Sequence, residues 1–239
     1  MTAGFLARRA LATQGNYRLP PFGALQIRAV ERALRLAWQE LRASPAVYGV
    51  QLATANEVAI SEGLLRVVDL LRNQGSIRAF TKDFETPHSD GGLSNYNGQK
   101  LAKRPDLSFK LKVNPAPGIH GIQHRLFVEA KVLNGGKQTV GKYCSDGLSR
   151  YVVGDYAWGM PHAFMLAYVK KPTFTLPASL DTHLAKNGGA YNVKGAKAVK
   201  CTYTTVKPDA FHTTHGRTWT FKDGTSPGDI QLIHLWLNV

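Results

Sequence analysis

The sequence predicts a mixed α/β fold, because two kinds of apolar pattern alternate along its 239 residues. Segments such as 25–43 and 56–72 repeat apolar residues with the period of a helix, whereas 123–133 and 162–169 are apolar runs of strand length. Hydrophobic residues make up 44% of the chain, which is enough for one core without disulfides or a structural metal. We therefore expect one domain in which helices cover a central sheet.

The individual elements are predicted from periodicity, caps and turn residues. The predicted helices span 25–43, 56–72 and 146–158, the last with Asp146 as its N-cap. The predicted strands span 76–84, 106–113, 123–133, 162–169, and the regions near 201–206 and 230–238. Long polar or glycine-rich segments, at 85–104 and 181–200, are predicted as loops.

Two acids and a lysine are predicted to gather on neighbouring strands. Glu129 and Lys131 project from the same face of their strand, because side chains alternate with a period of two. If this strand pairs with 106–113 around a loop centred between residues 117 and 118, Asp106 faces Glu129. A slip of one residue would turn one acid away from the other.

Paired carboxylates of this kind suit a hard cation such as Mg²⁺. Mn²⁺ is expected to be able to substitute for it. The lysine ammonium can orient an attacking water and offset negative charge on a phosphate. A plainer interpretation remains open, in which Asp106 belongs to a turn and Glu129 and Lys131 form an exposed cross-strand pair.

Pro105-Asp106 and Glu129-Ala130-Lys131 match the motif of the PD-(D/E)xK nuclease superfamily, which this chain resembles. The resemblance implies a three-layer α/β/α restriction-endonuclease-like core with a central mixed β-sheet. It places that core at 51–170, between an N-terminal helical extension at 1–50 and a C-terminal β extension at 171–239.

Later segments resemble uncharacterised members of the same superfamily. They are Gly147–Tyr156 with the strand that follows it, His215-Gly216-Arg217, and 230–237. Members often serve in restriction or anti-phage defence and act as dimers, so a homodimer or a defence-complex partner is an expectation from the resemblance.

The resemblance also implies a third acid, on the helix that precedes the first core strand. Glu57 is the favoured candidate, because it shares an inward stripe with Ser61 and Leu64. Glu62 instead lies on the side that carries Arg66. Glu57 would have a purely local role if Thr54 to Glu57 formed a capping box at the start of the helix.

The charge balance favours a nucleic-acid partner. Thirty basic against sixteen acidic residues give a formal net charge of +14, which attracts polyanions and makes such binding depend on salt. The residues predicted to contact nucleic acid are Lys100, Lys103, Arg104, Lys137, Lys142, Arg150, His215 and Arg217. Plainer roles remain open, as solvated loop lysines for Lys100 and Lys103 and as a surface or helix-packing side chain for Arg150. The arginines of 25–43 are expected on a solvated face.

Other classes are disfavoured by the sequence. Cys144 and Cys201 provide neither a disulfide framework nor a zinc spacing, and they suit a reducing cytoplasm. His212 and His215 form only a weak metal-binding pattern. Arginines interrupt the first apolar stretch, and no apolar run has the length of a membrane span, so secretion and a membrane partner are not expected.

These observations lead to the hypothesis of a Mg²⁺-dependent DNA nuclease, with Asp106, Glu129 and Glu57 as metal ligands and Lys131 beside the nucleophilic water. Two alternatives remain open. One is a nucleic-acid-binding subunit that keeps the fold without cutting. The other is a basic RNA-associated structural protein in which the acid–lysine motif is coincidental.

Overall fold

The computed structural model describes residues 19–89, 92–100, 103–113, 123–137, 139–201 and 210–239. Six strands form one mixed sheet in the order β1-β2-β3-β6-β5-β4. Their bounds are Leu107–Lys110 (β1), Arg125–Leu133 (β2), His162–Val169 (β3), Val193–Lys200 (β4), Phe211–His215 (β5) and Ile230–Asn238 (β6). β2, β3 and β6 are parallel, whereas β1, β5 and β4 pair antiparallel with their neighbours.

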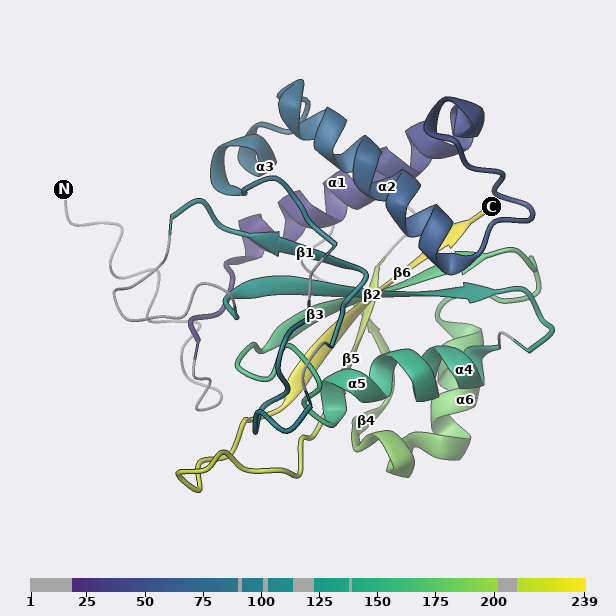
Figure 1. Cartoon of the computed structure of the whole chain (residues 1–239). Coiled ribbons are helices and arrows are strands. Elements are labelled where there is room, and N and C mark those ends of the chain that lie inside the picture. The colour runs from purple at the N-terminus through teal and green to yellow at the C-terminus, as the bar shows by residue number, and fades with distance from the viewer. Residues whose placement is uncertain (1–18, 90–91, 101–102, 114–122, 138, 202–209) are drawn as a thin grey trace.

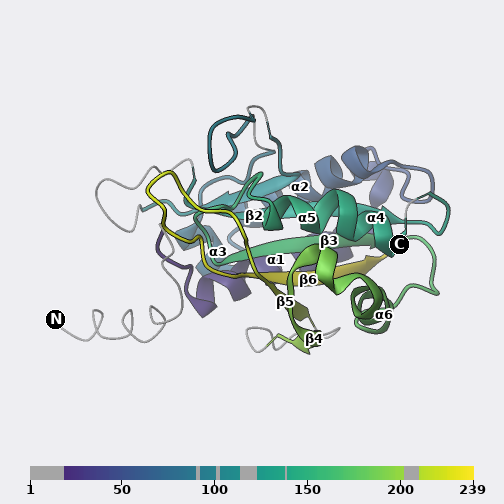
Figure 2. The same ribbon diagram turned by 90° about the horizontal axis from the view of Figure 1, so that it is seen from below.

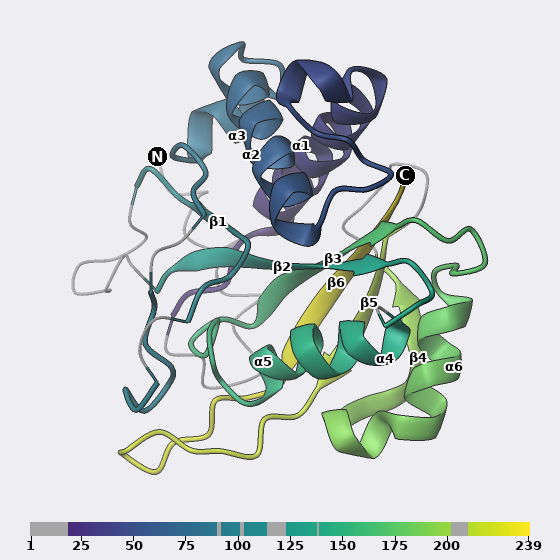
Figure 3. The same cartoon turned by 45° about the vertical axis from the view of Figure 1, so that its right-hand side comes forward.

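Helices cover both faces of this sheet (Figure 1). One layer contains α1 (Ala24–Ala43), η1 (Pro45–Tyr48), α2 (Glu57–Asn73) and α3 (Arg78–Asp83). The opposite layer contains α4 (Val140–Tyr143), the π-helical turn η2 (Cys144–Leu148), α5 (Ser149–Val152), α6 (Ala178–Asn187) and η3 (Gly188–Tyr191). Figures 2 and 3 show α4 and α5 in line along the sheet, with α6 near β4. The predicted mixed α/β class with a central mixed sheet is confirmed.

The hydrophobic stripe of α1 is buried, as its periodicity predicts. Ile27, Val30 and Leu34 expose 1% or less of their surface. The arginine face is not uniformly solvated, however, because Arg35 is buried and its Nε lies 2.6 Å from Glu31 Oε1. This pairing satisfies a charge that would otherwise be costly inside the protein.

Three sequence predictions of secondary structure are wrong. Residues 78–83 form α3 instead of a strand, because Ile77, Phe80 and Phe84 are buried with helical spacing. The helix predicted at 146–158 begins six residues earlier, where the Thr139 side chain accepts a hydrogen bond from Lys142 N, and Asp146 lies inside η2.

The segment at 181–200 is not a loop. Its first part lies in α6, which buries Leu180 and Leu184 one turn apart, and its last part forms β4 against β5. β3 and β6 match their predictions, whereas most of the strand predicted at 201–206 lies outside the described residues. The last three strands belong to the central sheet itself, so residues 171–239 complete the sheet instead of extending beyond it.

The register between β1 and β2 is the predicted one. Leu107 pairs with Val128 and Ser108 with Phe127, which places Asp106 opposite Glu129. The centre of the connecting loop lies outside the described residues.

A buried chain of hydrogen bonds joins β5, β6 and α4. His215 Nδ1 lies 2.8 Å from the Tyr191 carbonyl, which can only accept, so this nitrogen carries the proton. His215 Nε2 then accepts from the Thr213 hydroxyl at 2.7 Å, and Thr213 Oγ1 accepts from His234 Nε2 at 2.7 Å. His234 Nδ1 lies 2.7 Å from the Tyr143 hydroxyl. Burial lowers the pKa of both histidines, so both imidazoles are neutral at neutral pH.

This chain predicts a loss of stability in mild acid. Burial lowers the pKa of His215 to about 4 and holds that of His234 well below its ordinary value. Unfolding raises both values to about 6.5, so the unfolded state takes up protons first and stability falls as the pH drops from about 6.5 towards 4. Each group contributes about 1.4 kcal/mol per pH unit within its window. Urea unfolding at pH 7.5, 6 and 5 measures the slope.

His234→Gln provides the comparison for this prediction. It removes one titrating group, so its stability is expected to fall less steeply with acid than that of the wild type, whatever its stability at pH 7.5. Equal slopes for the two proteins would show that His234 does not titrate on unfolding.

Candidate active site

The short length of β1 positions the first acid. β2 extends beyond the end of its pairing with β1, so the backbone N–H of Ala130 has no strand partner on that side. The Asp106 side chain takes this place, and its Oδ2 accepts from Ala130 N at 2.7 Å. Asp106 is thereby fixed at the sheet edge, opposite Glu129.

Lys131 joins the acids. Its ammonium donates to Glu57 Oε1 at 2.8 Å, to Glu129 Oε1 at 2.8 Å and to the Ala130 carbonyl at 2.7 Å. The Glu129 side chain exposes 1% of its surface, Lys131 13% and Glu57 26%. The structure therefore brings together Asp106, Glu129, Lys131 and Glu57, which we name the acid–lysine cluster.

Glu57 reaches the cluster from the first residue of α2. The N-cap is Asn56, whose side chain accepts from Ala59 N at 2.9 Å, and Thr54 bonds to Gln51. The capping box from Thr54 to Glu57 is therefore wrong. Glu62 lies on the exposed side with Arg66, at 3.8 Å, so Glu57 is the helix acid of the cluster.

Two further residues hold Glu129. Arg150 Nη1 lies 2.8 Å from Glu129 Oε1, and the Tyr156 hydroxyl donates to Glu129 Oε2. Both oxygens of this buried carboxylate are thus occupied. Sequence reasoning missed Tyr156, because its position depends on the turn that follows α5. It lies two residues after Gly154, whose φ of 73° ends the helix.

The helix above the cluster approaches β2 closely at Gly147. A Cβ atom at this position would lie 2.8 Å from Met165 Cε, 3.4 Å from Lys131 Cγ and 3.5 Å from Glu129 Cγ. Gly147 is in the π-helical turn η2, which leads into α5 and Arg150. Such turns often occur at functional sites, because the extra residue redirects the side chains that follow.

The pKa values reflect this burial. Burial, followed by the charge of Glu129, raises the pKa of Asp106 to about 7, although Lys131 and the Ala130 N–H oppose the shift. Burial also raises the pKa of Glu129, against the effect of Lys131 and Arg150. Burial alone would lower the pKa of Lys131, but Glu129 and Glu57 raise it above its ordinary value. Lys131 is therefore charged at neutral pH.

The oxygen atoms of the cluster are ligands of the kind that hard cations bind. The three acids offer carboxylate oxygens, which Mg²⁺ and Mn²⁺ prefer, and two of them, Glu57 and Glu129, already bind one cation, the Lys131 ammonium. Within the described ranges, no group of three or more His, Cys, Asp or Glu side chains has the spacing of a metal site. In this arrangement the ammonium lies where the acids converge.

Six of the predicted nucleic-acid contacts are at least partly exposed. Lys100 and Lys103 place their Nζ atoms 3.4 and 2.7 Å from the carboxylate of Asp155, which is buried. Arg104 and Lys137 are exposed, and Lys142 forms an exposed pair with Asp146 at 3.3 Å. Arg150 exposes 38% of its side chain while it holds Glu129.

His215 and Arg217, in contrast, are corrected to structural roles. His215 is fully buried in the hydrogen-bond chain of β5. Arg217 exposes 6% of its surface and donates to the carbonyls of Ala157, Trp158, Pro227 and Gly228. Neither side chain has an exposed group for a phosphate, because both lie in the interior of the fold.

The fold and the cluster define a mixed α/β protein with a buried acid–lysine centre. Comparisons of the chain with protein-family models, with curated proteins and with solved structures find no match. Among the described helices, none has the length and apolar character needed to cross a membrane.

The packing at Gly147 gives a testable prediction. The mobile end of Met165 can accommodate one methyl group, but the larger side chain of Gly147→Val would meet the stems of Lys131 and Glu129. We expect a loss of about 1–3 kcal/mol in the free energy of unfolding, measured by urea denaturation. Gly189→Val is the control, because nothing lies within 4 Å of a Cβ there; its effect should stay within about 0.5 kcal/mol. Equal effects of the two substitutions would contradict the close approach.

Proposed function

We propose that this protein is a metal-dependent nuclease that hydrolyses phosphodiester bonds of DNA. The observation that carries the proposal is the convergence of Asp106, Glu129, Lys131 and Glu57 from three separate segments. An isolated surface pair would not bury Glu129 or draw an acid from a distant helix.

The arrangement of elements supports a restriction-endonuclease-like core. β1 and β2 are antiparallel, with Asp106 directly before β1 and facing Glu129 of β2, and the chain continues from β2 through α4, η2 and α5 to the parallel strand β3. This is the order implied by the PD-(D/E)xK resemblance, in which the lysine follows the second acid by two residues.

Asp106, Glu129 and Glu57 would hold a Mg²⁺ ion, for which Mn²⁺ can substitute. A bound divalent cation supplies charge that polarises a phosphoryl oxygen. Lys131 would then orient the attacking water and offset the charge that develops on the phosphate. Arg150 contributes a second cation, beside the Glu129 carboxylate, and part of its side chain reaches the surface.

The charge of the chain supports DNA as the substrate. The net charge of +14 favours a polyanion, and Lys103 and Arg104 lie two or three residues before Asp106 in the chain. A restriction or anti-phage setting, a homodimer and a defence-complex partner are further parts of the proposal that rest on the resemblance alone.

A second candidate function is a nucleic-acid-binding subunit that does not cut. The observation that favours it is the internal neutralisation of the acids by Lys131 and Arg150. A basic RNA-associated protein is the third alternative, and competition between duplex DNA and RNA at several salt concentrations separates it from the other two.

Cleavage tests the proposal directly. Purified protein with plasmid DNA and Mg²⁺ or Mn²⁺ is expected to cut, and Lys131→Ala is expected to reduce the rate about 100-fold or more, because it removes a cation at the developing charge. Lys186→Ala, an exposed change on α6, is the control. DNA binding by the wild type without cleavage in either metal would favour the non-cutting subunit.

Metal binding can be measured without activity. Mg²⁺ or Mn²⁺ at 100 times its Kd is expected to stabilise the wild type by about 2.7 kcal/mol, seen as a rise in Tm. Asp106→Asn should abolish most of this rise, because it removes a ligand, whereas Glu62→Gln should keep it, because Glu62 lies on the exposed side of α2. A rise of the same size in all three proteins would place the metal elsewhere.

A further inference from the structure

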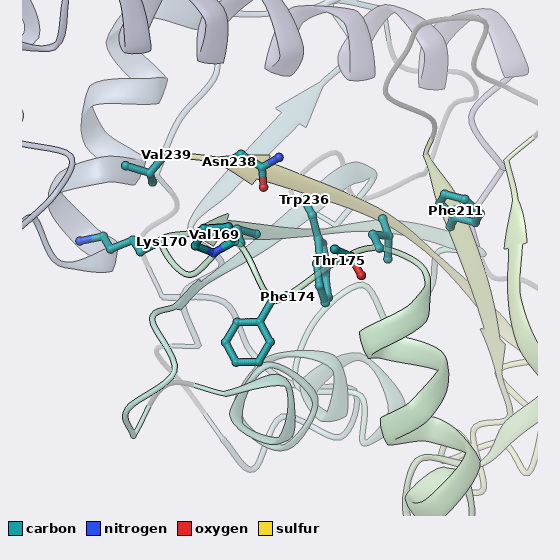
Figure 4. Close-up of a pocket in the computed structure, with 10 residues that line it drawn as sticks. Val169, Lys170, Phe174, Thr175, Phe211, Trp236, Asn238 and Val239 are labelled. Atoms are coloured by element: carbon teal, nitrogen blue, oxygen red, sulfur yellow. The ribbon is translucent and has the colours of Figure 1, made fainter.

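A pocket opens at the carboxyl ends of β3 and β6, outside the acid–lysine cluster (Figure 4). Its volume is about 670 Å³, within the range of about 300–1,000 Å³ that holds small ligands. The end of β3, the loop that follows it, the end of β6 and the first residue of β5 supply the lining. Open α/β sheets bind ligands beyond the carboxyl ends of their strands, so the position favours a binding site.

The wall of the pocket is aromatic and firmly held. Trp236 exposes only 7% of its surface, and its ring packs edge to face with Tyr143 at 5.8 Å and 76°. Figure 4 shows the Trp236 indole near the middle of the lining, with Asn238 above it and the Phe174 ring below. A fixed indole beside a half-buried phenyl ring suits a flat ring, which gains by stacking.

Two neutral polar side chains line the pocket. Asn238 contributes an amide and Thr175 a hydroxyl. Lys170 carries the one charged side chain among the described lining residues, and its Nζ is turned away to the carbonyls of Ala55 at 2.6 Å and Ala53 at 3.1 Å. A flat ring with donors and acceptors on its edge matches this lining better than a phosphate, and nucleobases are recognised by such stacking and edge contacts.

The pocket and the acid–lysine cluster include residues that are aligned across the sheet, Trp236 of β6 and Lys131 of β2. Ala167 of β3 pairs with Lys131 on one side and with Trp236 on the other. Lys131 and Trp236 therefore project from the same face, two strand spacings or about 10 Å apart. Lys170 also links the pocket to the cluster, because its Nζ donates to the carbonyl of Ala55, two residues before Glu57.

We propose that this pocket binds a nucleobase. The base comes either from a nucleic-acid strand whose backbone lies at the acid–lysine cluster or from a free nucleoside. The first source rests on the proposed nuclease function and implies that the enzyme takes an unpaired nucleotide; the second does not depend on it.

Nucleoside binding tests the pocket without cleavage. Calorimetric titrations of the full chain with adenosine and with cytidine, in the absence of divalent metal, are expected to show saturable binding of at least one of them. Phe174→Ala should weaken it about tenfold by removing a stacking surface, and Asn238→Ala should weaken it by removing edge contacts. Val47→Ala, at a residue that is 78% exposed on η1, is the control and should leave binding unchanged. Absence of saturable binding, or binding indifferent to Phe174→Ala, overturns the proposal.

A second arm identifies the source of the base. Short single strands that each carry one abasic residue are compared with the intact strand for metal-free binding. If an abasic residue at one position weakens strand binding about tenfold in the wild type but not in Phe174→Ala, the pocket binds a base of the substrate strand. If all strands bind equally well while adenosine still binds, the pocket binds a free nucleoside. Cleavage without nucleoside binding overturns only the pocket proposal, whereas nucleoside binding without cleavage in either metal overturns only the nuclease.

Discussion

The structure depends on one electrostatic constraint: a buried acid with other acids beside it needs a cation. Glu129 exposes 1% of its side chain, and the half-buried Asp106 lies opposite it across the β1–β2 pair. The two carboxylates repel each other, and Glu129 also loses its hydration, which is strongly unfavourable without compensation. Lys131 supplies it from the same strand and also draws in Glu57, so one ammonium connects the sheet to α2.

The same contacts resolve a backbone problem at the sheet edge. β1 pairs with only part of β2, which leaves the Ala130 peptide without strand partners on that side. Asp106 accepts from its N–H, and Lys131 donates to its carbonyl. The side chains proposed for chemistry therefore also complete the hydrogen bonding of the strand that carries them. This double role ties the side chains of the cluster to the backbone of the strand.

The sequence predicts the strand part of the cluster better than its helical part. The alternation around Glu129 and Lys131 fixes their common face, and the loop centre assumed between residues 117 and 118 gives the register that places Asp106 opposite Glu129. Tyr156 and Gly147 escape prediction, since both depend on a helix that starts at Thr139 and contains a π turn. Burial of His215 was equally hidden, because β5 becomes an interior strand only when β4 pairs beside it. Burial of Arg217 depends on loop carbonyls from two distant segments, which the sequence does not bring together.

Arg150 joins the buried centre to the surface. A guanidinium carries five N–H donors in a fixed plane; Nη1 serves Glu129 and lies 3.5 Å from the Tyr156 hydroxyl, while 38% of the side chain reaches solvent. Glu129 already has Lys131 as a cation, so it does not depend on Arg150 alone for neutralisation. In the proposed function, a phosphate that bound the guanidinium would therefore leave Glu129 paired with Lys131. Arg150 would attract the anion while Lys131 kept the buried carboxylate neutralised.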